Sequence, residues 1–417
     1  MNASLFTIHT DCRACGHSPM DLAVQFDPLP IASPNVGIAS SEREAMGRVL
    51  VPLDLCRCPA CGLLQLSATV DASFQYLNFQ YVTTISVGLP EHFRQAAADT
   101  LSVVGKDCVN KVLEIGSNDG TLLRAYYELG MDVLGIDPAE KAASIANANG
   151  IPTIHGFFEP STATNILDRL GPADLVISNN TLANIDQLID FTRTIKRVMA
   201  LDGVFVFETS YGCDVINNML IDTIYFEHIS YFTVKPLVAF FANIGLELFR
   251  VETIPIKGGS IRGYVQHKGA SHPIHPSIGQ LIAAEERTGL YKPETYQAMT
   301  NDFLRRKESV QRLIADAKAK GVRVAAWGAS VGCLTLISQF GIASSIECIY
   351  DDHPLLEAMV VPDRQIPVYP STEFRRTSPG LVIMLAWRYA DRIITQNQPL
   401  WTDQTRFLHL FPNVELL

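Results

Sequence analysis

Hydrophobic residues gather in short runs along most of the chain, and from residue 111 these runs alternate with segments of helical spacing. The alternation opens with a predicted strand at 111–115, a glycine-rich turn at 116–120 and a helix at 121–129. Further strands and helices follow in turn, the strands at 132–136, 152–157, 174–178 and 203–208, the helices at 139–149, 163–170 and 185–199. This alternation predicts a parallel sheet with helices on both faces.

The alternating segment ends differently from how it begins. A helix at 234–244 precedes two strands at 246–254 and 260–266, which are separated only by Lys257-Gly258-Gly259. Two strands joined by so short a glycine turn predict an antiparallel hairpin. We therefore expect a mixed sheet that is closed by a hairpin at one edge.

The last third of the chain repeats the strand–glycine–helix pattern. Residues 275–320 have helical spacing, and a strand at 323–327 leads into a second glycine turn. Strands at 346–350 and 381–386 follow. We predict a second, Rossmann-like α/β domain here.

The first 75 residues differ from the rest, being rich in Cys, Pro and short β-like runs, and the first helical spacing falls at 91–104. At roughly 150 residues per domain, 417 residues suggest two or three domains. We predict a small metal-binding domain at 1–75, a central α/β domain at 76–269 and the Rossmann-like domain at 270–417.

Composition narrows the class of protein. With 47% hydrophobic and 18% charged residues, the chain has ample material for packed cores and is not mostly disordered. Its net charge of −10 argues against a broad surface for nucleic acid or anionic membranes. The uncharged run 324–346 raises the question of a membrane span, but its glycines, serines and Gln339 favour a buried strand, turn and helix. Residues 1–11 lack the basic start of a signal peptide, so we expect a cytoplasmic, reducing setting.

Five of the nine cysteines lie within the first 61 residues. Cys12 and Cys15 form one Cys-x-x-Cys pair, and Cys58 and Cys61 form another. Two such pairs supply the four thiolates of a closed, structural Zn²⁺ site. Cys56 is a spare that could replace Cys58, and buried thiols or a redox pair are the alternatives to zinc.

The first glycine turn reads Glu114-Ile-Gly116-Ser-Asn118-Asp-Gly120 between a strand and a helix. A dinucleotide fingerprint would place glycine at 118 and 121, where this chain has Asn and Thr. An acid on the strand followed by G-x-N-x-G matches instead the S-adenosylmethionine (SAM) loop of class I methyltransferases. We predict that the cofactor-binding residues lie in this loop and at the ends of the first, second and fourth strands: Glu114, Gly116, Asn118, Gly120, Asp137 and Asn179.

A second candidate site is Tyr225-Phe-Glu227-His228, in an irregular region after the fifth predicted strand. Methylation of carbon needs a carbanion equivalent, so a base must remove a proton next to a carbonyl group. A histidine with a pKa near 6.5 suits that role at neutral pH. A carboxylate can hold the tautomer of the base, and a tyrosine hydroxyl can hydrogen-bond an enolate. The alternative is an aromatic-rich loop with a core histidine.

The series of motifs resembles the SAM-dependent sugar C-methyltransferases, which act at C3 of nucleotide-linked 4-keto-deoxysugars. The resemblance covers nearly the whole chain and also includes Gly258-Gly-Ser-Ile-Arg-Gly-Tyr264 and Trp327-Gly-Ala-Ser330. It implies a zinc domain, a SAM domain and a C-terminal domain for the nucleotide-sugar, which would be of dTDP, GDP or CDP type.

The same resemblance assigns catalytic roles. His228 would abstract the C3 proton, Glu227 would position this base, and Tyr225 and Tyr81 would orient or stabilise the ketone. The expected substrate-binding residues are Lys257, Ser260, Arg262, Gly328, Ser330, Asp351, Trp387 and Arg388. The expected protein is a monomer or weak homo-oligomer without a nucleic-acid or membrane partner.

Two positions depart from the pattern of the family. Val331-Gly332-Cys333 stands where the family usually carries Lys-Gly, and Arg388 follows Trp387 where Asn is expected. Both lie in the presumed nucleotide pocket, so they bear on the identity of the nucleotide or sugar. Methyl transfer to another small ketone or a hydroxyl group, and a zinc-containing protein that binds SAM without catalysis, are the competing hypotheses.

Overall fold

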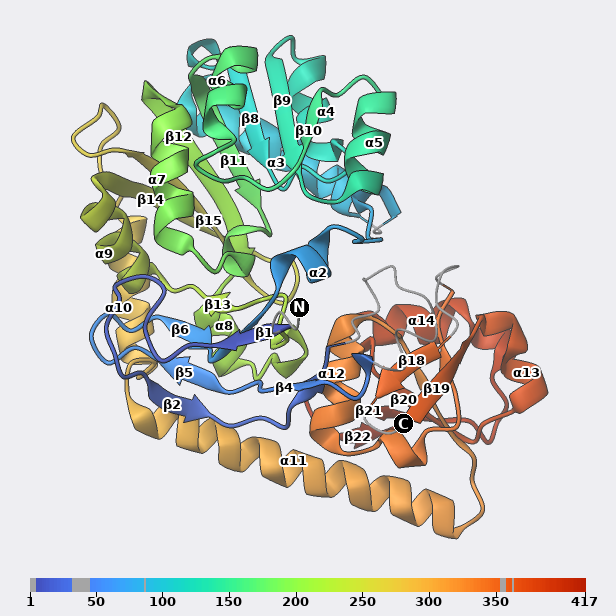
Figure 1. The fold of residues 1–417 in the computed structure, drawn as a ribbon. Coiled ribbons are helices and arrows are strands. Elements are labelled where there is room, and N and C mark those ends of the chain that lie inside the picture. Colours follow the sequence, from blue (N-terminus) through green and yellow to red (C-terminus); the bar gives the residue numbers. More distant parts are fainter. Residues whose placement is uncertain (1–4, 32–45, 86–87, 353–357, 362–363) are drawn as a thin grey trace. The chain divides into compact units, whose positions relative to one another are not determined.

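The computed structural model describes residues 5–31, 46–85, 88–352, 358–361 and 364–417. These residues form two compact units (Figure 1). Unit 1 comprises Met1–Asp21, Cys56–Asp214 and Glu227–Tyr291, and unit 2 comprises Leu22–Leu55, Val215–Phe226 and Lys292–Leu417. The division into three domains at 75 and 269 stays a prediction.

Unit 1 contains a seven-stranded sheet in the order β10-β9-β8-β11-β12-β15-β14. The strands are β8 (Lys111–Ile115), β9 (Asp132–Asp137), β10 (Thr153–His155), β11 (Ala173–Asn179), β12 (Met199–Ser210), β14 (Leu246–Ile254) and β15 (Ser260–His267). All pairs from β10 to β12 are parallel, whereas β15 is antiparallel to both β12 and β14. This order, closed by an antiparallel hairpin, is that of class I SAM methyltransferases and confirms the predicted fold class.

Helices cover both faces of this sheet (Figure 1). The helices of residues 72–287 are α2 (Ala72–Tyr76), α3 (Leu89–Val104), α4 (Thr121–Glu128), α5 (Glu140–Ala148), α6 (Ala163–Leu170), α7 (Leu188–Val198), α8 (Gly212–Asn217), α9 (Val234–Ile244) and α10 (Ser277–Arg287). Short 3-10 turns connect several of them: η1 (Thr83–Ile85), η2 (Lys106–Cys108), η3 (Leu182–Asn184) and η4 (Ile221–Thr223).

Alternate residues of β12 face opposite sides of the sheet, as a strand requires. Val204 and Val206 pack in one hydrophobic cluster with α3 and α4. Phe205 and Phe207 contact the ring of Phe241 on α9, at 6.4 and 5.8 Å between centroids. Because β12 is buried on both faces, it reads as a continuous apolar run in the sequence.

The cysteine-bearing segment adds small antiparallel pairs to unit 1. Strand β1 (Phe6–Ile8) pairs with β7 (Ala68–Val70), and β6 (Leu64–Leu66) pairs with β13 (Ser230–Tyr231) and adjoins β5 (Leu55–Arg57). Between the first two cysteines lies Arg13, which is buried and donates to the carboxylate of Asp186 at 2.9 Å and to the carbonyl of Leu66 at 2.8 Å. Since a buried guanidinium without these partners would be costly, Arg13 fixes this segment in place.

Unit 2 contains a second seven-stranded sheet, in the order β18-β19-β17-β16-β20-β21-β22. Its strands are β16 (Val324–Trp327), β17 (Ile349–Tyr350), β18 (Ala358–Val361), β19 (Arg364–Tyr369), β20 (Leu381–Met384), β21 (Arg406–His409) and β22 (Glu415–Leu416); β2 (Asp21–Val24), β3 (Leu29–Pro30) and β4 (Leu50–Val51) lie earlier in the chain. The five strands from β19 to β21 are parallel. Their order reverses between β16 and β20, which confirms the predicted Rossmann-like topology.

The helices of unit 2 follow the same layered plan. They are α11 (Pro293–Ala319), α12 (Val331–Phe340), α13 (Phe374–Thr377) and α14 (Ala390–Gln396), with turns η5 (Ala343–Ser345), η6 (Ser371–Glu373), η7 (Trp387–Tyr389) and η8 (Gln398–Leu400). One core cluster joins Trp327, Tyr350 and Met384 of the sheet to Phe374 of α13. The uncharged run 324–346 is thus β16, a glycine turn and α12, as predicted.

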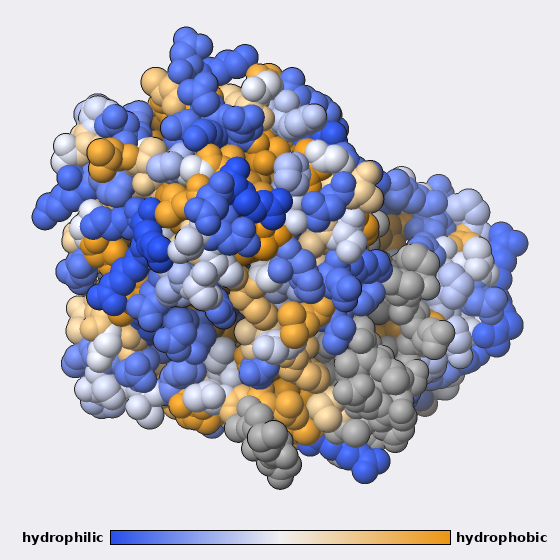
Figure 2. All heavy atoms as spheres, turned by 45° about the horizontal axis from the view of Figure 1, so that its top comes forward, coloured by the Kyte–Doolittle hydropathy of each residue, from blue (hydrophilic) through white to orange (hydrophobic). Residues whose placement is uncertain are grey.

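On the face drawn in Figure 2, hydrophilic side chains are widespread and hydrophobic ones gather in patches between them. Among the described residues, no helix is both long enough and apolar enough to span a bilayer.

Candidate active site

The glycine-rich turn between β8 and α4 has the conformation that its sequence predicts. Gly116 and Gly120 have φ values of 74° and 77°, a region that residues with a Cβ rarely adopt. A Cβ on Gly116 would lie 2.2 Å from Oγ1 of Thr181. The turn therefore needs glycine at 116 both for its backbone conformation and for the close approach of the loop after β11.

Asn118 and Asp137 are brought together at the ends of β8 and β9. The backbone N–H of Asn118 donates to Oδ2 of Asp137 at 2.8 Å, and the N–H of Ala139 donates to Oδ1 at 2.8 Å. Burial raises the pKa of Asp137, and these two hydrogen bonds oppose the rise. Each carboxylate oxygen keeps a second lone pair for a further donor, such as a ribose hydroxyl.

Several polar atoms are buried at this edge of the sheet. Oε2 of Glu114, Oγ of Ser117 and Oδ1 of Asn179 have no hydrogen-bond partner among the described residues. Burial raises the pKa of Glu114 well above its ordinary value, and the charges of Asp137 and Asp119 add to the rise. Buried polar atoms without partners are costly, so this edge is suited to a polar ligand.

These residues fit the predicted cofactor. The strand ends supply carboxylate and amide acceptors, and the glycine turn lets the backbone approach a ligand closely. Glu114, Gly116, Asn118, Gly120, Asp137 and Asn179 all lie on β8, β9 and β11 or in the turn that follows β8. The structure thus brings the six predicted cofactor residues to the carboxyl edge of one parallel sheet.

Tyr81 contacts this turn through its backbone. Nδ2 of Asn118 donates to the carbonyl of Tyr81 at 3.2 Å, and Oδ1 of Asn118 accepts from the N–H of Thr83 at 2.8 Å. The N–H of Thr84 donates to Oδ2 of Asp119 at 2.9 Å. The segment that carries the predicted catalytic tyrosine is therefore held by the predicted cofactor loop.

The acid–base segment runs from η4 to β13. Glu227 is buried, and Tyr225 and His228 are half-buried. The hydroxyl of Tyr76 donates to the carbonyl of Glu227 at 3.4 Å. Burial and the charge of Glu227 raise the pKa of Tyr76, and a hydrogen bond with Asn184 opposes that rise. Tyr76 and Asn184 are thus neighbours of this segment that the sequence reasoning missed.

Arg262, a predicted substrate residue, lies in a buried ionic cluster. Its Nη2 donates to Oε2 of Glu208 at 3.1 Å, and its Nη1 lies 3.4 Å from Oδ2 of Asp99. His92 contacts the other oxygen of Glu208 at 2.7 Å. Burial alone would raise the pKa of Glu208, but His92 and Arg262 together lower it. The guanidinium of Arg262 is therefore already balanced by two carboxylates, and its role in substrate binding stays a prediction.

Two further predicted substrate residues lie at the hairpin of unit 1. Ser260 is buried at the start of β15 and donates to the carbonyl of Ile256 at 3.2 Å. Lys257 is exposed in the turn, where its φ is 55°. Burial of its ammonium group lowers the pKa of Lys257, and the charge of Glu208 opposes that fall. The role of both residues in substrate binding stays a prediction.

The second glycine turn lies at the carboxyl end of β16 in unit 2. Gly328 has a φ of 107°, and its N–H donates to the carbonyl of Tyr350 at 2.9 Å. Ser330 caps α12 by accepting from the N–H of Cys333, and Oδ2 of Asp351 accepts from the N–H of Ala329 at 2.9 Å. The structure thus joins Gly328, Ser330 and Asp351 at one edge of the sheet.

Trp387 and Arg388 follow β20 at the same edge of the sheet. The guanidinium of Arg388 lies 4.4 Å from the ring centroid of Trp387. Both side chains donate to the carboxylate of Asp222, Trp387 through Nε1 at 3.1 Å and Arg388 through both terminal nitrogens. The structure thus gives these two residues a protein partner that the sequence did not indicate.

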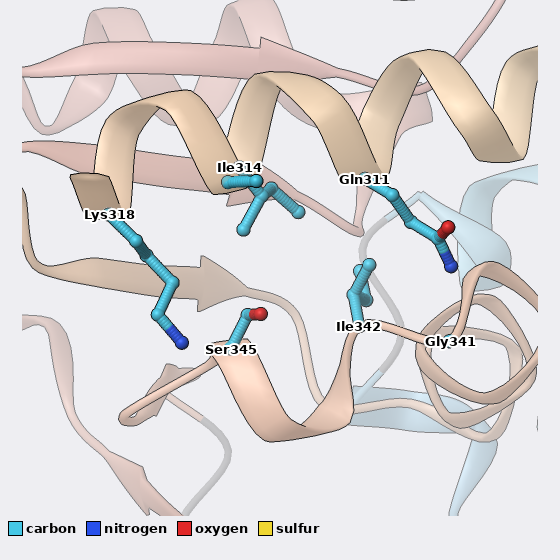
Figure 3. Close-up of a pocket in the computed structure, with 7 residues that line it drawn as sticks. Gln311, Ile314, Lys318, Gly341, Ile342 and Ser345 are labelled. Carbon is cyan, nitrogen blue, oxygen red and sulfur yellow. The ribbon is translucent and has the colours of Figure 1, made fainter.

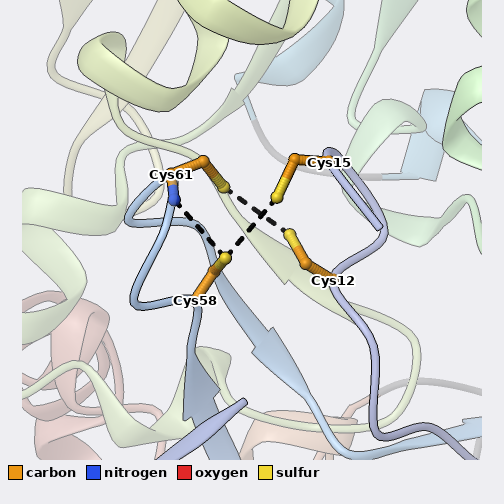
Figure 4. A group of neighbouring side chains, drawn as sticks. All are labelled: Cys12, Cys15, Cys58 and Cys61. Atoms are coloured by element: carbon orange, nitrogen blue, oxygen red, sulfur yellow. Dashed lines mark hydrogen bonds between the residues drawn. The ribbon is translucent and has the colours of Figure 1, made fainter. Parts of the chain in front are cut away.

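The two Cys-x-x-Cys pairs form one cluster in unit 1, and their side chains point toward one another (Figure 4). The Sγ atoms of Cys12, Cys15, Cys58 and Cys61 all lie within 4.8 Å of one another. The Cys12–Cys61 and Cys15–Cys58 distances are both 3.6 Å. Zn–S bonds of about 2.3 Å in a tetrahedron place sulfurs about 3.8 Å apart, so the four atoms fit Zn²⁺.

The loops of the cluster have the form that a metal knuckle requires. Gly16 and Gly62 have φ values of 72° and 87° and donate to the carbonyls of Cys12 and Cys58. The hydrogen bond from Cys61 lowers the pKa of Cys12 to about 5 and raises that of Cys61. Cys58 rather than Cys56 is the member of the cluster.

A separate surface cavity of about 320 Å³ lies in unit 2, between α11 and the segment that follows α12 (Figure 3). It is lined by Gln311, Ile314, Ala315, Lys318, Gly341, Ile342 and Ser345. None of these is a predicted site residue, and the described side chains around it carry a single cation.

Comparisons with known proteins agree with the two α/β sheets. Residues 90–251 match the model of a methyltransferase domain, and residues 255–412 match that of a C-methyltransferase C-terminal domain. Fold and site thus define a SAM-dependent methyltransferase.

The chain is 28% identical over 408 residues to the C-methyltransferase NovU of Streptomyces niveus, which covers 98% of this chain and 96% of that protein. Together with the C-terminal domain match, this makes the chain a SAM-dependent C-methyltransferase. The hypothesis of a SAM-binding protein without catalysis is set aside.

Solved structures match less than half of the chain. The PH0226 protein of Pyrococcus horikoshii is 13% identical with a TM-score of 0.36, and covers 45% of this chain and 95% of its own. The CcbJ methyltransferase of Streptomyces caelestis is 14% identical with a TM-score of 0.33, and covers 42% and 90%.

Proposed function

We propose that the enzyme methylates C3 of a nucleotide-linked 4-keto-deoxysugar. The observation that carries the proposal is the contact between Asn118 and Tyr81, which links the cofactor loop to the segment predicted to meet the ketone. The match to a C-methyltransferase domain supports carbon, rather than oxygen, as the methyl acceptor. The nearby acid–base segment supports an acceptor that must first lose a proton.

The chemistry follows from the acidity of a carbon next to a ketone. His228 takes the C3 proton, the C3–H bond breaks, and the electron pair moves toward the 4-keto oxygen as an enolate. Bound SAM supplies an electrophilic methyl group. Glu114, Asn118 and Asp137 would hold SAM, whose sulfonium would release the methyl group to C3, and His228 later releases its proton to water. Tyr81 and Tyr225 stabilise the enolate by hydrogen bonds, and Glu227 positions His228.

The nucleotide part of the substrate is assigned to unit 2. In open α/β sheets, ligands bind at the carboxyl ends of the strands where the strand order reverses, which here lies between β16 and β20. The turn Gly328–Ser330 leads into α12, and the N-terminus of a helix favours phosphate. This local field accommodates a pyrophosphate although the whole chain carries a net charge of −10.

We further propose that Cys12, Cys15, Cys58 and Cys61 hold a structural Zn²⁺ ion. The spacing of their sulfur atoms supports this assignment. A metal with four thiolates has no open position, so zinc would stabilise the fold and take no part in the reaction.

The decisive experiment separates proton abstraction from methyl transfer. Wild-type enzyme with the substrate and demethylated SAM in D₂O should exchange the C3 hydrogen for deuterium, and His228→Ala should not. With ¹³C-methyl SAM, the wild-type product should show a C–CH₃ signal. The control is His275→Ala, because His275 is exposed at the start of α10. Undiminished exchange in His228→Ala would remove His228 as the base, and an O–CH₃ signal would contradict the proposed acceptor.

A second measurement addresses the substrate class. Mass spectrometry of ligands that co-purify with the enzyme should find SAM or its demethylated product together with a nucleoside diphosphate or nucleotide-sugar. Turnover of a small ketone without a nucleotide, at a rate equal to that of the nucleotide-sugar, would contradict the role of unit 2.

A further inference from the structure

Residues Val215–Phe226 make an excursion from one unit to the other. The chain leaves unit 1 after Asp214, contributes this segment to unit 2, and returns to unit 1 at Glu227. The return falls inside the acid–base motif, because Tyr225 belongs to unit 2 while Glu227 and His228 belong to unit 1. The contacts that hold Val215–Phe226 in unit 2 therefore also hold Tyr225, the first residue of the acid–base segment.

The carboxylate of Asp222 is the polar centre of this excursion. The side chain of Asp222 is 9% exposed, and that of Arg388 is 22% exposed. Nη1 of Arg388 and Nε1 of Trp387 both donate to Oδ2 of Asp222, and Nη2 of Arg388 donates to Oδ1 at 3.2 Å. The Trp387 ring in turn lies 5.3 Å from the ring of Phe411. Such a two-pronged ion pair fixes orientation as well as distance.

Backbone contacts hold the same excursion against α12. Oγ1 of Thr335 donates to the carbonyl of Ile224 at 3.4 Å. A Cβ on Gly332 would lie 2.5 Å from the carbonyl oxygen of Asp222, so only glycine at 332 lets the two segments approach this closely. Gly332 stands in the part of the turn where the sequence departs from the family's pattern, and this contact gives it a function.

The far end of the acid–base segment is held independently. The N–H of Ile229 donates to the carbonyl of Ala183 at 2.9 Å, and the N–H of Leu66 donates to the carbonyl of Ile229 at 2.9 Å. Within unit 1, these two bonds hold Ile229, the residue that follows His228.

We propose that Asp222 is a positioning residue for methyl transfer, which fixes Tyr225 within unit 2 through Trp387 and Arg388. This proposal rests on the proposed function, because it takes Tyr225–His228 as the segment that acts on the substrate. It also gives Arg388 a use other than substrate binding, since both of its terminal nitrogens are engaged by Asp222. Asp222 is then the partner of Arg388, the residue that stands where the family has Asn.

The first test is Asp222→Asn, which keeps the shape of the side chain and removes its charge. Loss of a charge-assisted, largely buried contact should lower kcat about tenfold or more. The KM for the nucleotide-sugar and the Kd for SAM should stay within about twofold. The control is Asp190→Asn, which removes a surface ion pair with Arg193 whose side chains are 58% and 67% exposed.

Two further variants separate positioning from simple stability. The charge exchange Asp222→Arg with Arg388→Asp should recover part of the kcat that either single change loses. Gly332→Ala should lower kcat by crowding the carbonyl of Asp222, while Gly279→Ala, a helical glycine with open space around its Cα, should not. All rates are compared at a temperature where circular dichroism shows each variant folded.

Three outcomes would overturn the proposal. An unchanged kcat in Asp222→Asn would show that the contact is dispensable. A lower KM for the nucleotide-sugar would show that Asp222 competes with the substrate for Arg388. A loss of kcat that matches the unfolded fraction would reduce the contact to a structural one. Deuterium exchange at C3 distinguishes these failures from failure of the proposed function, because that function fails only if wild-type enzyme does not exchange or His228→Ala does.

Discussion

Nδ2 of Asn118 donates to the backbone carbonyl of Tyr81 at 3.2 Å, across 37 positions of sequence. One side chain of the cofactor loop therefore holds the segment that carries a predicted catalytic tyrosine. Since Oδ1 of Asn118 also accepts the N–H of Thr83, both the nitrogen and the oxygen of its side-chain amide form hydrogen bonds. Cofactor loop and catalytic segment form one hydrogen-bonded assembly.

Asn118→Gly should break the contact between the cofactor loop and the segment that carries Tyr81. Glycine tolerates the φ of 48° at this position, so the change removes the side chain without adding backbone strain. The change removes three hydrogen bonds, because the hydroxyl of Thr83 also donates to Oδ1 at 3.2 Å. At about 1 kcal/mol each, their loss predicts a fall on the order of 100-fold in kcat/KM. Ser378→Gly, at a φ of 42° in unit 2, controls for glycine at positive φ. Steady-state kinetics that show equal activity in both variants would contradict the coupling.

Gly116→Ala should abolish SAM binding. The new methyl group would collide with Oγ1 of Thr181, and the φ of 74° would be strained. Gly130→Ala suffers similar strain at a φ of 88° but has open space around it, so it should bind SAM normally. Isothermal titration calorimetry checks both variants. Equal loss of affinity in the two would show that strain, rather than the contact with Thr181, limits this position.

Replacement of a cluster cysteine should remove the metal. Cys58→Ser should lower the zinc content from about one ion per chain to nearly zero and reduce the melting temperature, because metal binding contributes to folding. Cys56→Ser should retain the metal, since Cys56 is not part of the cluster. Elemental analysis by mass spectrometry measures the zinc content. Retention of zinc in Cys58→Ser together with its loss in Cys56→Ser would reassign the fourth ligand.

Glu114 should make stability depend on pH. Its pKa is raised in the folded protein, so the folded state holds a proton that the unfolded chain releases above about pH 4.5. The stabilisation that protonated Glu114 contributes is complete below that pH. It is lost as the pH rises through the pKa of Glu114 in the folded protein. Glu114→Gln has no proton to lose, so its melting temperature should fall less than that of wild type between pH 5 and pH 8. Parallel melting curves would contradict this assignment.

The spacing of hydrophobic residues predicted most strands of the sheet in unit 1. The strand at 246–254 and the helix at 234–244 agree with β14 and α9 to the residue, because both are flanked by turn residues and have one clear period. The helix expected at 185–199 is shorter, since η3 precedes it and α7 covers Leu188–Val198. The cysteine cluster was also predictable, because ligand spacing is a local property of sequence.

The partners of the acid–base segment were not predictable. Asp222 and Arg388 are 166 positions apart, and an isolated aspartate in a loop carries no periodic signal. Asn184 and Tyr76 approach the segment from separate turns of the chain. The hydrogen bond of Tyr76 to Glu227 joins positions 151 apart in the chain, and the place of Asp222 likewise depends on tertiary packing.

Arg13 links the cysteine cluster to a second loop of unit 1. Its guanidinium joins the knuckle between Cys12 and Cys15 to Asp186, two residues after Asn184. An intact fold around the cysteines therefore also keeps the loop that follows β11 in its place, because Arg13 is held within the same knuckle.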